Sequence, residues 1–175
     1  GIGFSIVAGP PMMVLLGTAT AVPVLLMLNT LVSAIAVDWR IWVVEKKTIK
    51  TAIVGCLLGV ALGLVVYPYL SEPIVLGLTA TLLLIGVLTT LVPLRSVTGT
   101  GGFAAISGLS GLATVWAATP GPLMVFGLIA TGRSAGDTRK LVQPIALAAY
   151  GVALLLHGLV DGADFALVPG VWTFF

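Results

Sequence analysis

Charged side chains divide the chain into long apolar runs, and the lengths of these runs predict its helices. Runs without Asp, Glu, Lys or Arg cover residues 1–37, 51–71, 73–94, 96–132 and 141–160. A helix needs about 20 mostly apolar residues to cross a bilayer. Three of the runs have that length, and we expect each to be one membrane span. The first and fourth runs are nearly twice as long, so each is expected to contain a break.

The break in the run at 96–132 is a short segment rich in proline and glycine, Ala118-Thr119-Pro120-Gly121-Pro122. Proline rings prevent a continuous helix there. Basic residues flank the run on both sides, and basic loops stay in the cytoplasm, so both ends are expected on one face. We therefore predict a re-entrant hairpin, whose irregular tip must be satisfied by protein or by a water-filled cavity. The alternative is a proline kink in an ordinary span.

The run at 1–37 is interpreted in the same way. It carries Gly9-Pro10-Pro11 early and a turn at 17–21, which indicate the remnant of a hairpin (1–17) followed by a full span (20–37).

A short internal similarity connects the two long runs. Pro11-Met12-Met13-Val14 can be aligned with Pro122-Leu123-Met124-Val125, and each is followed by a Gly/Thr turn and another span. The two copies are predicted to have opposite orientations, as in transporters built from inverted repeats. We therefore divide the chain into two transmembrane repeats, 1–95 and 96–175. Because the chain begins and ends inside apolar segments, we expect the first repeat to be incomplete at its N-terminus and the second at its C-terminus.

The distribution of charge predicts the topology. Every basic residue lies at 38–50, at 95 or at 133–140, and these loops are predicted to be cytoplasmic. The turn at Glu72 and the loop with Asp161 and Asp164 contain no basic residue, so they are placed on the opposite side. The predicted fold is all-α, a polytopic inverted-repeat helical bundle with broken, re-entrant hairpin helices. The expected location is the cell inner membrane.

The composition supports a membrane protein and argues against several other classes. Of 175 residues, 59% are hydrophobic and only 8% are charged, whereas a soluble domain has about 25% charged residues. There is no extended basic surface for nucleic acid. Cys56 is the only cysteine and His157 the only histidine, and no predicted span holds a carboxylate pair. We therefore expect no metal, no cofactor and no enzymatic activity, and we expect Cys56 to be a small buried side chain.

The predicted hairpin tip is the strongest candidate for a binding site. A helix that begins near Gly121 has free N–H groups and the positive end of its dipole at its start. Such amides bind anions without a charged side chain. This suits a transporter, because a permanent cation would hold the anion too tightly for release. We expect a matching helix start near Pro11 and Met12.

Polar residues around the tip complete the candidate site. Ser107, Ser110 and Thr114 recur at helical spacing, although hydroxyls in helices also bond their own backbone carbonyls. Amides such as Asn29 and Gln143 usually have partners inside a membrane. Arg139 is interpreted either as a lipid-phosphate ligand or as a group that attracts an anionic substrate. The predicted substrate-binding residues are Pro11, Met12, Asn29, Ser110, Thr119, Gly121, Pro122, Arg139 and Gln143.

Three segments carry a resemblance to a known family. They are the Gly- and Pro-containing start at 1–17, Val37-Asp38-Trp39-Arg40, and Gly108-Leu109-Ser110-Gly111 followed by Thr119-Pro120-Gly121-Pro122-Leu123. In these the chain resembles the sulfite exporter TauE/SafE family of membrane transporters, whose members are usually longer. The resemblance implies export of small sulfur-containing anions, such as sulfite or organosulfonates. It also implies coupling to a proton or sodium gradient. The alternatives are an anion channel, a non-transporting membrane subunit and a membrane enzyme.

Overall fold

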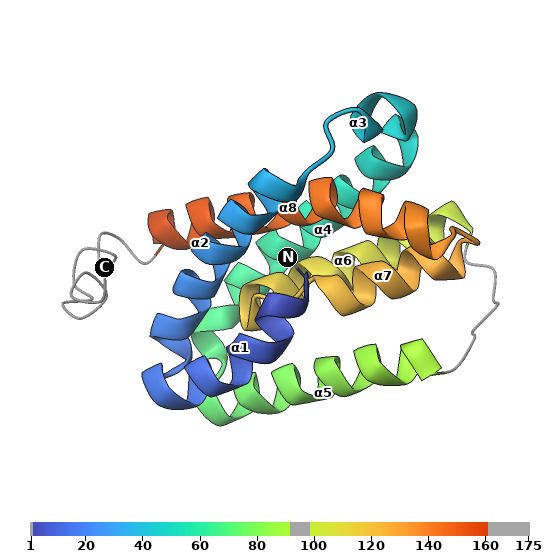
Figure 1. The fold of residues 1–175 in the computed structure, drawn as a ribbon. Helices are drawn as coiled ribbons and strands as arrows, with labels where there is room; N and C mark the ends of the chain where they lie inside the picture. Colours follow the sequence, from blue (N-terminus) through green and yellow to red (C-terminus); the bar gives the residue numbers. More distant parts are fainter. Residues whose placement is uncertain (1, 92–98, 161–175) are drawn as a thin grey trace.

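The computed structural model describes residues 2–91 and 99–160, and the regular structure within these ranges is entirely helical (Figure 1). The predicted all-α class is therefore confirmed. The helices are α1 (Ile2–Leu16), α2 (Thr18–Ala36), α3 (Ile41–Val44), α4 (Lys46–Val66), the 3-10 turn η1 (Tyr67–Tyr69), α5 (Glu72–Leu91), α6 (Thr100–Ala117), α7 (Gly121–Ala130) and α8 (Ala135–Val160).

Three of these helices are long and apolar enough to cross a membrane. They cover Thr18–Ala36, Lys46–Tyr69 and Ala135–Leu159, and they indicate a membrane protein. They correspond to three of the predicted spans. Helix α5 covers most of a fourth, and its crossing of the membrane stays a prediction. Arg95, Asp161 and Asp164, which contributed to the predicted topology, lie outside the described residues.

Helices α4, α6 and α8 all run in the same direction. Gly55 of α4 lies against Ala104 of α6, and Gly63 lies further along against Val115. Arg133, just before α8, pairs with Glu45 at the start of α4. At the other end of α8, the ring of His157 meets the ring of Tyr67, with centroids 5.3 Å apart. We call the end of the bundle near Glu45 the basic end, and the end near Tyr67 the far end.

Helix α2 runs in the opposite direction to α4 and α8. Its first amide, that of Thr18, donates a hydrogen bond to Glu72 Oε1 at the far end (3.2 Å). The helix then returns toward α3 at the basic end, packed along α8 (Figure 1). A single residue, Gly17 with φ of 75°, separates α1 from α2. The expected turn at 17–21 is therefore shorter than predicted.

The closest helix contact is a glycine seam between α4 and α6. A Cβ atom added at Gly55 would lie 2.7 Å from the carbonyl oxygen of Ala104. A Cβ at Gly59 would overlap the carbonyl of Gly108, and one at Gly111 would overlap the carbonyl of Cys56. Small residues allow the backbones of membrane helices to approach closely.

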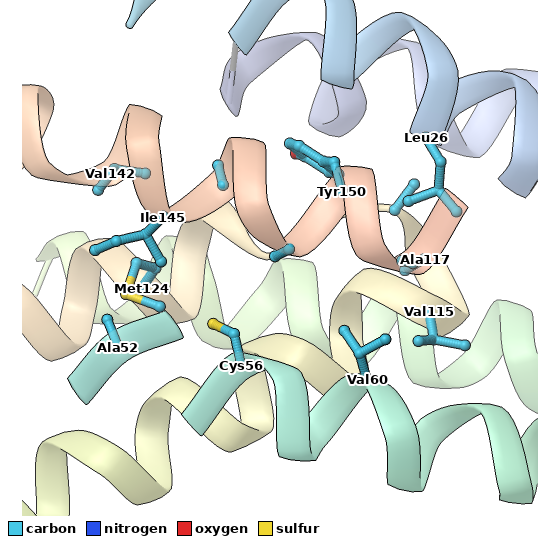
Figure 2. Packing of buried hydrophobic residues seen from close by; sticks show 14 of the residues in the cluster. Leu26, Ala52, Cys56, Val60, Val115, Ala117, Met124, Val142, Ile145 and Tyr150 are labelled. Atoms are coloured by element: carbon cyan, nitrogen blue, oxygen red, sulfur yellow. The ribbon is translucent and has the colours of Figure 1, made fainter. Parts of the chain in front are cut away.

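Buried apolar side chains from α2, α4, α6, α7 and α8 form one core (Figure 2). Cys56 belongs to this core and is 1% exposed, as predicted. Met124 of α7, Ile145 of α8 and Ala52 of α4 also belong to it. Helix α7 is therefore held between other helices rather than lying on the outside of the bundle.

One prediction about the first hairpin is wrong. Helix α1 continues through Pro10 and Pro11 without a break, so no helix begins near Pro11 and Met12. Each proline removes one backbone donor, but its fixed φ is compatible with a helix, and neighbouring helices allow prolines inside membrane helices. The chain reverses instead at Gly17, where the positive φ needs a glycine.

Candidate functional site

The predicted reversal of the run at 96–132 is confirmed. Helices α6 and α7 are separate and pack against each other in opposite directions. Ser110 Oγ donates to the carbonyl oxygen of Pro120 (2.7 Å), and further along Gly127 lies against Phe103 and Ile106. Both ends of this hairpin are therefore near the basic end of the bundle. Its position relative to a membrane stays a prediction.

The turn itself is a tight helix cap followed by a short return. Ala118 has φ of 49° and is the only non-glycine residue with positive φ in the described ranges. Its amide donates to Thr114 O (3.0 Å), and the amide of Thr119 donates to Ala113 O (3.4 Å). The left-handed conformation ends α6 by satisfying its last carbonyls. The chain then doubles back beside α6 before α7 begins.

This return brings the start of α7 to the middle of the bundle. Gly111 of α6 lies against Cys56, the central residue of α4. The neighbouring Ser110 holds Pro120, the residue immediately before α7. Ten residues of α7 span about 15 Å, roughly half of the length of α4. Helix α7 is thus a half-helix, which runs from the middle of the bundle to the basic end.

Two amides at the start of α7 make no hydrogen bond within the described ranges, those of Gly121 and Leu123. The intervening Pro122 has no N–H, and the first bonded amide is that of Met124, which donates to Pro120 O (3.2 Å). Gly121 is buried and Leu123 is only 7% exposed. Buried amides without partners are costly and rare, so these two are available donors.

Thr119 adds an available hydroxyl beside these amides. It is 4% exposed, and its Oγ1 has no hydrogen-bond partner among the described residues. Two other buried hydroxyls of the hairpin are engaged: Ser107 donates to Phe103 O and Thr114 donates to Ser110 O, both at 2.8 Å. The alternative that helix hydroxyls bond their own backbone carbonyls therefore holds for Ser107 and Thr114. Ser110 instead holds the turn.

The two predicted amide side chains lie on other helices of the core. Asn29 of α2 is fully buried, and its Nδ2 donates to Leu25 O (2.7 Å). Gln143 of α8 is half-buried, and its Oε1 is buried without a partner in the described part of the chain. It lies two residues before Ile145, which is in the same cluster as Met124 of α7 (Figure 2). Because residues i and i+2 of a helix do not share a face, this proximity does not place the side chain of Gln143 toward α7.

The remaining predicted residues lie away from the turn. Arg139 is exposed on the first turns of α8, near the basic end. Pro11 is exposed and Met12 is half-buried, both inside α1. The structure thus brings Ser110, Thr119, Gly121 and Pro122 together at one place, and it does not bring Pro11 or Arg139 there.

Sequence reasoning missed an ion pair that fixes the open end of the hairpin. Arg133 donates to both carboxylate oxygens of Glu45 (2.6 and 2.8 Å) and to Thr48 Oγ1 (2.9 Å). The hydrogen bond from Arg133 holds the pKa of Glu45 below its ordinary value, against an opposing effect of burial. The two residues are 88 positions apart. Only the prediction that their two loops lie on the same face could have indicated the pair.

The chain was compared with protein-family models, with curated proteins and with solved structures, and no match was found.

Proposed function

We propose that this protein is a membrane transporter for small anions, and that the anion binds at the start of α7. The observation that carries the proposal is the set of available donors buried there, namely the amides of Gly121 and Leu123 and the hydroxyl of Thr119. All are donors to a negative ligand, and the positive end of the α7 dipole adds to them.

The chemistry of these donors favours an oxyanion that must also be released. The whole segment 96–132 has no charged side chain, so neutral groups would hold the ligand. A sulfite or organosulfonate group presents several oxygen acceptors to such donors. This agrees with the substrate class implied by the resemblance to sulfite exporters. Gln143 of α8 stays a proposed contributor of an additional amide.

The arrangement of helices supports transport by alternating access. The donors are buried, so a ligand reaches them only when helices move. The aligned segments in α1 and α7 run in opposite directions, as do the helices that follow them, α2 and α8. In transporters built from inverted repeats, such elements rock around a central site. We place the basic end in the cytoplasm of a multi-pass inner-membrane protein, and a proton or sodium gradient is the proposed driving force.

The first test is transport by the purified protein in liposomes. We expect saturable uptake of labelled sulfite or a small organosulfonate, with counterflow when unlabelled anion is inside. Saturable uptake without counterflow would indicate a channel. If labelled sulfite, sulfonates and carboxylates all fail to move, the protein is not a transporter of these anions and the proposal is wrong.

The second test locates the site. A panel of sulfite, sulfate, small sulfonates and carboxylates is first ranked by thermal shift in detergent. Gly121→Leu is then expected to abolish binding of the best anion, because its side chain would lie where the ligand approaches the amides. Gly121→Ala provides a smaller change should the leucine variant fold poorly, and it is expected to weaken binding. Unchanged affinity in a folded variant would place the site elsewhere.

A further inference from the structure

An apolar groove of about 660 Å³ runs along the outer side of the contact between α4 and α6. It exists because the glycine seam leaves no side chains where the two helices meet. Its walls come from larger residues of both helices, and its end nearest the basic end of the bundle is formed by Lys50 and Thr51. The wall residues include Val54, Leu58 and Leu62 of α4 and Ala105, Leu109 and Leu112 of α6.

The basic end of this groove adjoins a second, polar hollow. That pocket has a volume of about 350 Å³ and is lined by Lys47, Arg133 and several threonine hydroxyls. Thr51 lines both hollows, so they meet at this residue. Arg133 is neutralised by Glu45, whereas Lys47 and Lys50 are exposed and make no ion pair within the described ranges.

We propose that these two hollows bind one anionic phospholipid. Its phosphate would lie between Lys47 and Lys50, and one acyl chain would follow the groove. From Lys50 to Leu62 the helix rises about 18 Å, which is close to the roughly 15 Å depth of one leaflet of the hydrocarbon core. The groove therefore has the polarity and the length of a single lipid chain with a charged headgroup.

A second copy of the chain fits the groove less well. Two copies in one bilayer related by a two-fold axis along the membrane normal have the same orientation. A neighbour seated in this groove would therefore bring its own Lys50 to the same depth as the first. The like charges would repel, whereas an anionic headgroup is attracted by them.

The attraction between the two lysines and an anionic headgroup is tested by native mass spectrometry of the delipidated protein in detergent. Dioleoyl phosphatidylglycerol and dioleoyl phosphatidylcholine are added separately, because they share acyl chains and differ in net charge. We expect the first bound phosphatidylglycerol to be held more tightly than phosphatidylcholine. Lys50→Gln is expected to weaken phosphatidylglycerol binding about fivefold and to leave phosphatidylcholine unchanged. The matched control is Lys140→Gln, an exposed lysine of α8 outside both hollows, which is expected to keep the preference.

The groove itself is tested by filling it. Ala105 is exposed and lines the groove, so Ala105→Phe is expected to fold normally and to abolish tight binding of the first lipid. Ala61→Phe, on an exposed part of α4 outside the groove, is the control. The proposal is wrong if wild type holds the two lipids equally, if Lys50→Gln keeps the preference, or if Ala105→Phe keeps the tightly bound lipid. A dimer that Ala105→Phe dissociates would also overturn it, in favour of a second copy.

Discussion

Replacing Thr119 by valine tests whether its hydroxyl binds the ligand or supports the fold. The two side chains have nearly the same shape, so the substitution removes the hydroxyl and leaves packing almost intact. Oγ1 of Thr119 is buried without a partner among the described residues. A hydroxyl that stabilises the fold would make a hydrogen bond within it. The Thr119 hydroxyl makes none in the described part of the chain, so it does not stabilise the fold.

Thr119→Val is expected to make the fold more stable and to weaken anion binding. An unsatisfied buried polar group costs about 1–3 kcal/mol, so Thr119→Val is expected to raise the free energy of unfolding by about 1 kcal/mol or more. A hydrogen bond to a charged ligand is worth about 1.5–3 kcal/mol. Losing it is expected to raise the dissociation constant of the anion about 10- to 150-fold.

Both quantities can be measured on the same detergent-solubilised samples. Unfolding is followed by tryptophan fluorescence during titration with SDS, and binding of the best anion of the panel by calorimetry. The matched control is Thr114→Val, whose hydroxyl is bonded to its own helix at Ser110 O and which is expected to leave the affinity unchanged. If Thr119→Val is less stable than wild type and binds the anion equally well, the hydroxyl supports the turn and the reasoning is refuted.

Two further predictions concern stability. Gly59→Ala places a methyl group on the Gly108 carbonyl and is expected to lower the free energy of unfolding by about 1–3 kcal/mol. Gly77→Ala has open space around it and is expected to raise the free energy of unfolding by up to about 1 kcal/mol through helix propensity. SDS unfolding of both variants measures these changes, and equal effects would contradict the prediction. Hydrogen bonding to Arg133 lowers the pKa of Glu45 from its ordinary value of 4.5. The ion pair therefore stabilises the fold fully above pH 4.5, and this stabilisation is lost as the pH falls through the lowered pKa. Wild type should therefore lose up to about 1 kcal/mol more than Glu45→Gln between pH 7 and pH 3, and parallel stability curves would rule this out.

The helices and the reversal could be predicted from the sequence because both leave local signals. Charges cannot lie freely in lipid, so charge-free runs mark candidate spans. The double-length run with prolines at 120 and 122 contained α6, the turn and α7. The basic residues on both sides of that run indicated that its ends lie on the same face. The hairpin follows from these features without any knowledge of packing.

Other features depend on partners that the local sequence does not reveal. The pattern Gly9-Pro10-Pro11 indicated a break, but packing keeps α1 helical through both prolines. Hydroxyls at helical spacing indicated a shared polar face, yet two of them bond their own backbone and one holds Pro120. Which hydroxyl remains available depends on the path of the turn. That path is determined by the left-handed conformation of Ala118, a residue type that rarely adopts it.

The glycine seam also limits which parts of the protein can move independently. Helix α4 precedes residue 95 and α6 follows it, yet their backbones are in direct contact along most of α6. A motion that parted the chain at its midpoint would have to expose this interface to lipid. The ion pair at Arg133 connects α7 to the same unit. Any rigid-body movement therefore keeps α4, α6, α7 and the start of α8 together, and sliding surfaces must be sought where α2 and α5 face them.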